Sequence, residues 1–177
     1  KFGGSSVASS ENIKKVINII IATSKKQKII VVVSAFGKTT NALIEGAHLA
    51  QNKNSGYKEI IQKLEKHHFN VIEELIPKEQ HPTIVAHIKE LFNQLETIYK
   101  GCYLLEELSP KTLATISSFG ELLSASIIAE ISNLKIDTNY KDSRDLIVAS
   151  EMYLDAVVDF PATNKNITDY FKDATAH

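Results

Sequence analysis

Apolar side chains recur every three or four residues over most of this chain, which predicts a largely helical protein. We expect helices over residues 10–25, 41–51, 57–75, 83–105 and 110–132, the last interrupted near Gly120, and a final amphipathic helix from Thr163. Ser9 or Ser10 suits the cap of the first helix, and Ser109 followed by Pro110 suits the start of the fifth.

Short stretches with a different pattern predict a sheet. Residues 28–34 are continuously apolar and β-branched, which is typical of a strand buried on both faces. Residues 1–2 have the character of the end of an earlier strand, and residues 135–140 and 157–160 of later ones. Strand, helix and strand within the first 34 residues form a right-handed βαβ unit. The predicted class is therefore α/β, with a parallel sheet between helical layers and a long helical insertion.

Composition narrows the classes of protein. The 177 residues suffice for one domain or lobe with a proper core. The net charge of −1 leaves no basic excess for nucleic acid, and no apolar run approaches the ~20 residues that span a bilayer. The single cysteine, Cys102, forms no internal disulfide, which suits a reducing cytoplasm. We expect a cytoplasmic protein whose natural start precedes Lys1.

The turn at residues 3–6 (GGSS) carries candidate chemistry. Its two glycines allow φ above zero and close approach of the backbone to a ligand. Successive N–H groups and the following helix N-terminus would face an anion, and Lys1 would add a positive charge, which suits a phosphoryl group. The Walker and dinucleotide glycine patterns are absent. A tight turn beside an exposed lysine is the alternative.

Hydroxyl and carboxylate groups recur at two further places. Ser34 and Thr40 follow the predicted strand, where open α/β sheets bind ligands, although both could be ordinary loop hydroxyls. Ser118 and Glu121 have the spacing of a helix capping box. We expect Lys38 to be a solvated loop lysine.

The histidines and the cysteine suggest no metal site or nucleophile. His67 and His68 are adjacent and so face different sides of a helix, while His81 and His87 lack the i, i+4 spacing of zinc ligands. We expect surface or partly packed histidines, and Cys102 as a small buried residue.

Three segments, in this order, together resemble the aspartokinases. They are residues 1–7 (KFGGSSV), 33–41 (VSAFGKTTN) and 118–124 (SFGELLS). The resemblance covers most of the chain. It looks like the N-terminal aspartokinase part of chains that carry a homoserine dehydrogenase downstream.

The resemblance implies an amino-acid-kinase fold with one lobe for the amino acid and one for ATP. The implied reaction transfers the γ-phosphoryl group of ATP to the β-carboxylate of L-aspartate, the first step toward lysine, threonine and methionine, with ATP and Mg²⁺ as cofactors. Residues 1–177 would be the N-terminal, amino-acid-binding lobe. The C-terminal ATP lobe would lie outside them, so the isolated chain would be incomplete and inactive. The apolar faces of the inserted helices suggest a homo-oligomer.

The resemblance also assigns site residues on the ATP side. Lys1 would contact the ATP phosphates and stabilise the charge that develops during transfer. Gly3 and Gly4 would bring backbone N–H groups to the phosphates, and Ser5 would join them. No residue is assigned as a metal ligand.

On the aspartate side, Ser34 and Thr40 would hold the substrate, and Glu121 would bind its α-ammonium group. Many aspartokinases also carry an arginine that pairs with the substrate carboxylate, a few residues before an aspartate. Here Asp155 stands where that arginine is expected, and Asp159 fits the aspartate. Arg144, the only arginine in the chain, is a substitute carboxylate partner or a structural residue.

Two other readings remain open at this point. The chain could belong to a kinase of the same fold that acts on acetylglutamate, glutamate or a nucleotide monophosphate. It could also be a non-catalytic binding or oligomerisation lobe. Dehydrogenase activity within these residues is set aside because no dinucleotide signature is present.

Overall fold

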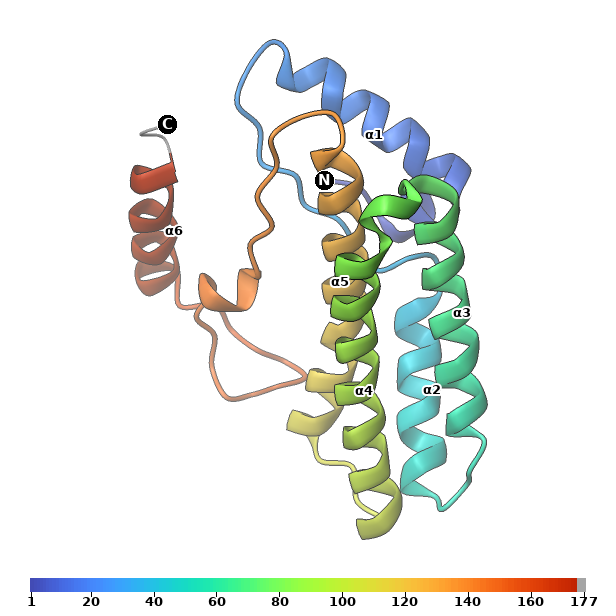
Figure 1. The fold of residues 1–177 in the computed structure, drawn as a ribbon. Coiled ribbons are helices and arrows are strands. Elements are labelled where there is room, and N and C mark those ends of the chain that lie inside the picture. The colour runs from blue at the N-terminus through green and yellow to red at the C-terminus, as the bar shows by residue number, and fades with distance from the viewer. Residues whose placement is uncertain (175–177) are drawn as a thin grey trace. The chain divides into compact units, whose positions relative to one another are not determined.

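The computed structural model describes residues 1–174, which divide into two compact units. The first unit, residues 1–140, holds most of the helices. Its elements are η1 (Gly4–Val7), α1 (Ser10–Ser24), α2 (Thr39–Gln51), α3 (Tyr57–Leu75), η2 (Lys78–Gln80), α4 (His81–Leu105) and α5 (Pro110–Asn133) (Figure 1).

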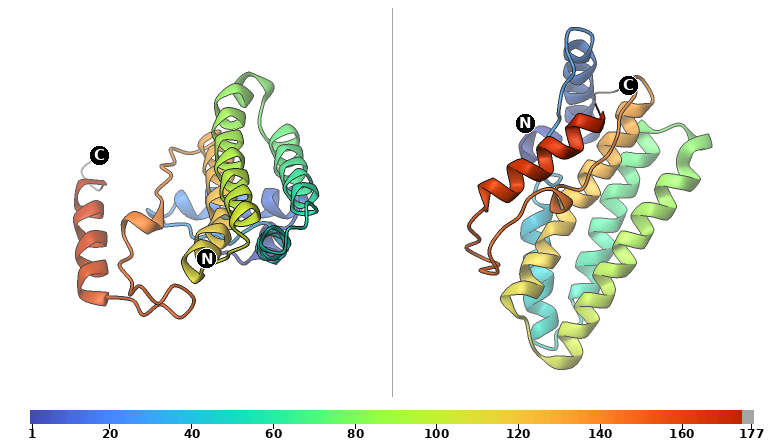
Figure 2. Two further views of the ribbon diagram at one scale, coloured as in Figure 1. Left: turned by 90° about the horizontal axis from the view of Figure 1, so that it is seen from below. Right: turned by 90° about the vertical axis from the view of Figure 1, so that its left-hand side faces the viewer.

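Four long helices form the body of the first unit. Helices α2, α3, α4 and α5 run side by side, and α1 lies at one end of them (Figures 1 and 2). Helix α2 packs against α3, α4 and α5, while α1 packs against α5 and α3. The predicted helices are therefore confirmed to within a few residues at each end.

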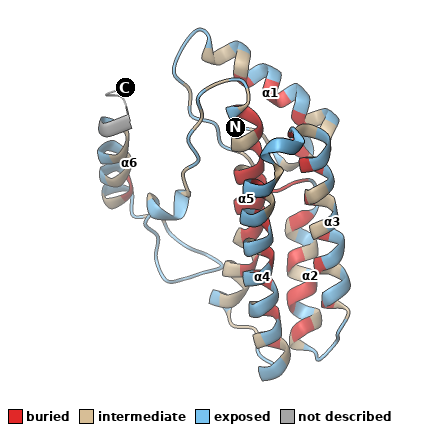
Figure 3. Cartoon of the chain, viewed as in Figure 1, coloured by how far each residue is buried: buried red, intermediate tan, exposed pale blue. Residues whose placement is uncertain are grey.

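The core of this unit lies between the apolar faces of the helices, whose buried sides point inward (Figure 3). Helices in proteins owe most of their stability to the packing of one apolar face rather than to intrinsic propensity. The largest fully buried side chains are those of Ile13, Phe36, Leu43, His68, Ile72, Ile88, Phe92, Leu95, Tyr99, Ile116, Leu123 and Ile127.

Side-chain caps begin two helices as predicted. The Ser9 hydroxyl accepts a hydrogen bond from the N–H of Asn12, and the Ser109 hydroxyl accepts one from the N–H of Thr112. The predicted interruption of α5 near Gly120 is wrong, because the helix is continuous through this glycine.

The predicted parallel sheet is also wrong for the described residues. They contain only two isolated bridges, a parallel one between Phe2 and Val33 and an antiparallel one between Ala149 and Val158. The side chains of Ile30 and Val32 are 68% and 53% exposed, although this segment was expected to be buried on both faces. A strand buries both of its faces only within a wider sheet. Among the described residues, this segment has one bridge, in which Val33 pairs with Phe2.

The second unit, from Lys141 onward, contains η3 (Ser143–Asp145) and α6 (Phe160–Ala174). A short hairpin precedes α6, in which the N–H of Ser150 donates to the carbonyl of Val157 at 2.9 Å. The predicted strand at residues 157–160 is reduced to this bridge. Helix α6 begins three residues before the predicted start at Thr163.

Helix α5 is long and apolar enough to cross a membrane by length and composition alone, which the sequence analysis did not anticipate. Half of its most apolar stretch is buried inside the unit, where α5 packs against α2 and α4. Burial in the core accounts for this apolar character.

Candidate functional site

The loop that follows Val33 brings two of the three motifs together. The N–H of Phe2 donates to the carbonyl of Val32 at 2.8 Å, and the N–H of Ser34 donates to the carbonyl of Phe2 at 3.0 Å. These two bonds hold the N-terminal residues beside the segment that ends at Ser34. The glycine turn therefore lies next to residues 34–37, which we call the site loop.

Gly4 packs closely against the site loop, so a side chain there would be crowded. A Cβ atom at Gly4 would lie 3.1 Å from the carbonyl oxygens of both Ala35 and Gly37, and 3.8 Å from the Ser34 hydroxyl oxygen. The N–H of Gly37 in turn donates to the carbonyl of Gly4 at 3.1 Å. At Gly3 the backbone is extended, and a Cβ would meet nothing within 4 Å. Among the described glycines, Gly37 is the one with positive φ.

The glycine turn leaves backbone donors available. In the described part of the chain, the N–H of Ser6 donates to the carbonyl of Gly3 at 2.9 Å, whereas those of Gly3, Gly4 and Ser5 donate to no protein acceptor. The side chains of Lys1 and Ser5 are exposed beside them. This edge of the molecule can therefore offer hydrogen-bond donors and a positive charge to an anion.

Glu121, in the middle of α5, reaches the other side of the site loop. Its Oε1 atom accepts from the N–H of Ala35 at 3.3 Å and from the Ser34 hydroxyl at 3.4 Å. Neither contact involves Oε2, and the carboxylate is exposed to solvent. One carboxylate oxygen thus contacts the loop, and the other is in neither of these bonds.

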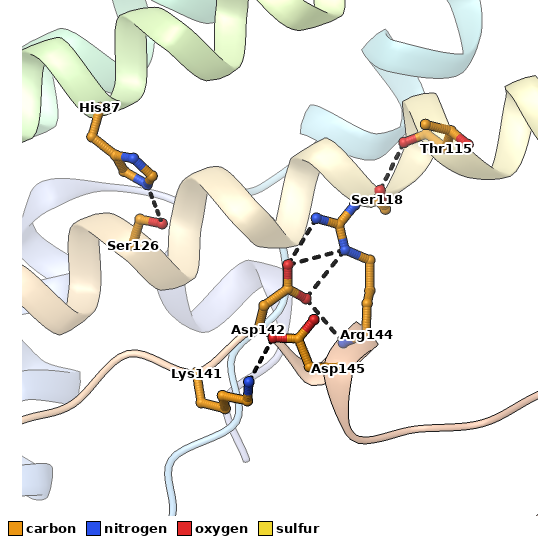
Figure 4. Close-up of polar contacts among 8 residues, drawn as sticks. All are labelled: His87, Thr115, Ser118, Ser126, Lys141, Asp142, Arg144 and Asp145. Atoms are coloured by element: carbon orange, nitrogen blue, oxygen red, sulfur yellow. Dashed lines mark hydrogen bonds and ion pairs between the residues drawn. The ribbon is translucent and has the colours of Figure 1, made fainter.

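The capping-box reading of the third motif is wrong. Ser118 and Glu121 both lie in the interior of α5, and the Ser118 hydroxyl donates to the carbonyl of Thr115 at 2.7 Å (Figure 4). Without a helix start at this point there are no free N–H groups to cap.

Gly120 and Ser124 complete the contact between α5 and the site loop. A Cβ at Gly120 would lie 2.8 Å from the Ala35 Cβ and 3.3 Å from the Thr40 hydroxyl oxygen. The buried Ser124 hydroxyl donates to the carbonyl of Ser34 at 2.9 Å. Both residues belong to the third motif, but neither was predicted as a site residue. Gly120 and Ser124 are four residues apart, a spacing that could have suggested one shared helix face.

The structure therefore gathers most of the predicted site residues around one loop. Ser34 lies near Gly4 and contacts Glu121, and Thr40 lies beside Gly120 at the start of α2. Lys38 is exposed, as expected for a solvated loop lysine. Over residues 1–174 there is no cluster of three potential metal ligands.

Arg144 and Asp159 lie in the second unit and make structural contacts there. The Arg144 guanidinium contacts Asp142, with 2.7 Å between Nη2 and Oδ2 (Figure 4). Burial raises the pKa of Asp142, but hydrogen bonds and charge from Arg144 outweigh it and hold that pKa below its usual value. The Asp159 carboxylate accepts from the N–H of Ala162 at 3.0 Å and so caps α6, while Asp155 is exposed.

The histidines differ in environment. His87 is exposed and contacts the Ser126 hydroxyl at 3.2 Å (Figure 4). These two residues line a pocket of about 210 Å³ between α4 and α5, and no residue of the three motifs lines it. His68 is fully buried, so the expectation of surface or partly packed histidines is wrong for this residue. Cys102 is buried as predicted, and burial raises the pKa of its thiol.

Comparison with known proteins agrees with these motifs. The amino acid kinase family matches residues 1–174. A bifunctional aspartokinase/homoserine dehydrogenase of Buchnera aphidicola is 32% identical over 94% of this chain and 21% of its own length. The chloroplastic aspartokinase 1 of Arabidopsis thaliana is 35% identical over 75% of this chain and 23% of its own length. The chain spans about a fifth of the length of these relatives. The resemblance to aspartokinases is confirmed.

Solved structures show the same arrangement. Escherichia coli aspartokinase III in complex with aspartate and ADP matches with a TM-score of 0.82 and 24% identity, over 94% of this chain and 36% of that chain. The same enzyme in complex with lysine and aspartate matches with a TM-score of 0.85 and 23% identity, over 98% and 37%. At these identities the likeness concerns the fold, which corresponds to about a third of the kinase chain.

Proposed function

This chain belongs to the amino acid kinase family, and from that premise we propose that it forms the amino-acid-binding part of an aspartate kinase. The aspartokinase relatives and the three motifs support the proposal. The observation that carries it is the meeting of Gly4, Ser34 and Glu121 at the site loop. There the backbone donors of the glycine turn adjoin hydroxyl and carboxylate groups suited to an amino acid.

The aspartate side of the proposed site matches the charges of its substrate. L-Aspartate carries one ammonium group and two carboxylates. The Glu121 carboxylate would accept a charge-assisted hydrogen bond from the ammonium group through Oε2, the oxygen that does not hold the site loop. The Thr40 hydroxyl would donate to a substrate carboxylate, and the Ser34 hydroxyl would do so by turning away from Glu121. The assignment of Arg144 and Asp159 to substrate binding stays a prediction from the resemblance.

The nucleotide side of the proposed site consists of the glycine turn. The N–H groups of Gly3, Gly4 and Ser5 would donate to ATP phosphates, and Lys1 would approach the γ-phosphoryl group. ATP is held with Mg²⁺, an ion that is usually bound by substrate phosphates and one or two carboxylates. The described residues, which contain no dedicated cluster of metal ligands, are compatible with an ion held mainly by the nucleotide.

The proposed chemistry needs alignment more than proton transfer. A β-carboxylate oxygen of aspartate attacks the γ-phosphorus, the bond from that phosphorus to the β,γ-bridging oxygen breaks, and ADP leaves. The nucleophile is already an anion, so no general base is required. Donors and positive charge around the transferred group stabilise the transition state. The product, β-aspartyl phosphate, would enter the synthesis of lysine, threonine and methionine.

Calorimetric titration with L-aspartate tests this proposal, with acetylglutamate and a nucleotide monophosphate as comparators. We expect selective binding of aspartate, and its loss in Glu121→Gln, because the amide cannot neutralise the ammonium group. Glu130→Gln, nine residues further along the same helix, is the matched control and should bind as the unaltered protein does. Selective binding of a comparator, or unchanged binding in Glu121→Gln, would refute the assignment.

A further inference from the structure

His68 is a buried titratable group that the proposed reaction does not use. It lies in α3 with a fully buried side chain, and its Nδ1 atom is 2.7 Å from the carbonyl oxygen of Leu64. A carbonyl oxygen only accepts hydrogen bonds, so Nδ1 carries the proton and Nε2 is a bare lone pair. Nε2 has no hydrogen-bond partner. An apolar side chain would avoid this unsatisfied nitrogen, so packing alone does not explain a histidine here.

The imidazole ring of His68 lies between two phenylalanine rings. It stacks on Phe36 with a centroid distance of 5.2 Å and an interplanar angle of 22°, and Phe92 of α4 meets it edge-on at 5.6 Å. The neighbouring His67 ring meets Phe36 edge-on at 6.2 Å. Phe36 is the one large side chain of the site loop, and it is 1% exposed. The buried Phe36 side chain of the site loop therefore packs on the flat face of the His68 ring.

The backbone of Phe36 connects this stack to the site. Its carbonyl oxygen accepts from the hydroxyl and the N–H of Thr39, at 2.6 and 3.0 Å. On either side of it, the N–H of Ala35 donates to Glu121 and the N–H of Gly37 donates to Gly4. A shift of the Phe36 ring would therefore move the peptide groups that orient both Glu121 and the glycine turn.

We propose that His68 is a positioning residue for amino-acid binding, which sets the site loop through its stack with Phe36 without touching substrate. This inference rests on the proposed function, because the substrate it concerns is the one that Ser34, Thr40 and Glu121 would bind. The neutral, flat ring fits the space between Phe36 and Phe92. A branched aliphatic side chain fills a similar volume but offers no planar face to the loop.

The test compares three variants of the intact kinase that carries this chain. His68→Leu removes the flat ring together with the unsatisfied nitrogen, so we expect unchanged or higher stability but an aspartate KM raised about tenfold, equivalent to ~1.4 kcal/mol. The KM for ATP should rise less than that for aspartate, since the N-terminal residues are also held by the bonds of Phe2 to Val32 and Ser34, which do not involve Phe36. His68→Phe keeps a flat ring against Phe36 and should restore most of the aspartate affinity. Ile61→Ala, a core truncation about two turns away on α3, should lower stability without raising the aspartate KM.

Calorimetry with aspartate distinguishes failure of the inference about His68 from failure of the proposed function. If the unaltered protein binds no aspartate, the proposed function fails and the inference fails with it. If the unaltered protein binds aspartate but His68→Leu binds it equally well, the inference alone is overturned. The same holds if Ile61→Ala weakens aspartate binding as much as His68→Leu does, because the effect would then follow general loosening of the core.

Discussion

The hydroxyl of Ser124 donates a 2.9 Å hydrogen bond to the carbonyl oxygen of Ser34, although 90 positions separate the two residues in the chain. Glu121, one turn earlier on α5, contacts the hydroxyl of the same Ser34. Two points on one helix therefore hold the start of the site loop. The parallel bridge between Phe2 and Val33 lies directly before this loop.

Removal of the Ser124 hydroxyl should loosen the site loop. Ser124→Ala leaves the Ser34 carbonyl without this donor, and we expect a loss of about 1 kcal/mol in the free energy of unfolding. We also expect weaker aspartate binding. Ser132→Ala is the matched control. Ser132 is buried on the same helix, but its hydroxyl donates to the carbonyl of Ile128 within that helix. Denaturant unfolding of both variants checks this, and an equal effect would mean that the contact to the loop is unimportant.

A methyl group at Gly120 should be poorly tolerated. Its Cβ would lie 2.8 Å from that of Ala35, so either α5 or the site loop must move. We expect Gly120→Ala to lower stability by about 1–3 kcal/mol, as overpacking usually does. Gly101→Ala, in α4, meets nothing within 4 Å and should raise stability by about 0.5–1 kcal/mol, because alanine favours the helix. A lowered midpoint of thermal unfolding for Gly120→Ala and a raised one for Gly101→Ala would confirm the close contact.

The two glycines of the turn should respond differently to alanine. Gly4→Ala places a Cβ 3.1 Å from two carbonyl oxygens and should destabilise the fold. Gly3→Ala has open space and an ordinary extended backbone, so its stability should be unchanged. If the turn binds ATP phosphates closely, Gly3→Ala will nevertheless raise the KM for ATP. A KM for ATP equal to that of the unaltered enzyme would show that Gly3 does not approach the nucleotide.

The stability of the chain should fall in mild acid because of His68. Burial lowers its pKa from the usual 6.5 to about 4, mainly because the charged form is desolvated, with a smaller contribution from the neighbouring His67. Between these values the unfolded chain binds the proton and the folded one does not, so acid favours unfolding. The full stability is present above pH 6.5, and about 3 kcal/mol is lost as the pH falls to about 4.

Denaturant unfolding of His68→Leu at several pH values checks this. Phe36 and Phe92, the rings packed on His68, carry no charge, so His67 is the titratable neighbour to consider. The pKa of His67 is itself lowered by burial, and its contribution should remain in His68→Leu. The variant should therefore lose less stability than the unaltered protein between pH 6.5 and 4. Parallel curves would show that His68 is not the group responsible.

Local signals in the sequence predicted the helices well and the sheet poorly. The spacing of apolar residues and the caps at Ser9 and Ser109 act within one helix, so they can be read without knowing the neighbours. The apolar run at residues 28–34 signals burial only if other strands flank it. In the described residues its partner is the single bridge at Phe2, so Ile30 and Val32 are exposed.

The candidate site, like the fold, was predicted only in part. The resemblance of three short motifs to those of the aspartokinases selected Gly4, Ser34, Thr40 and Glu121 as site residues, whereas the residue types alone left Glu121 as a possible helix cap. Which group faces which was decided only when α5 packed against the loop after Val33. Ser118 and Glu121, which have the spacing of a capping box, both lie in the interior of that helix. Helix packing also buried His68 beneath Phe36, since the apposition of residues 32 positions apart depends on how whole helices pack.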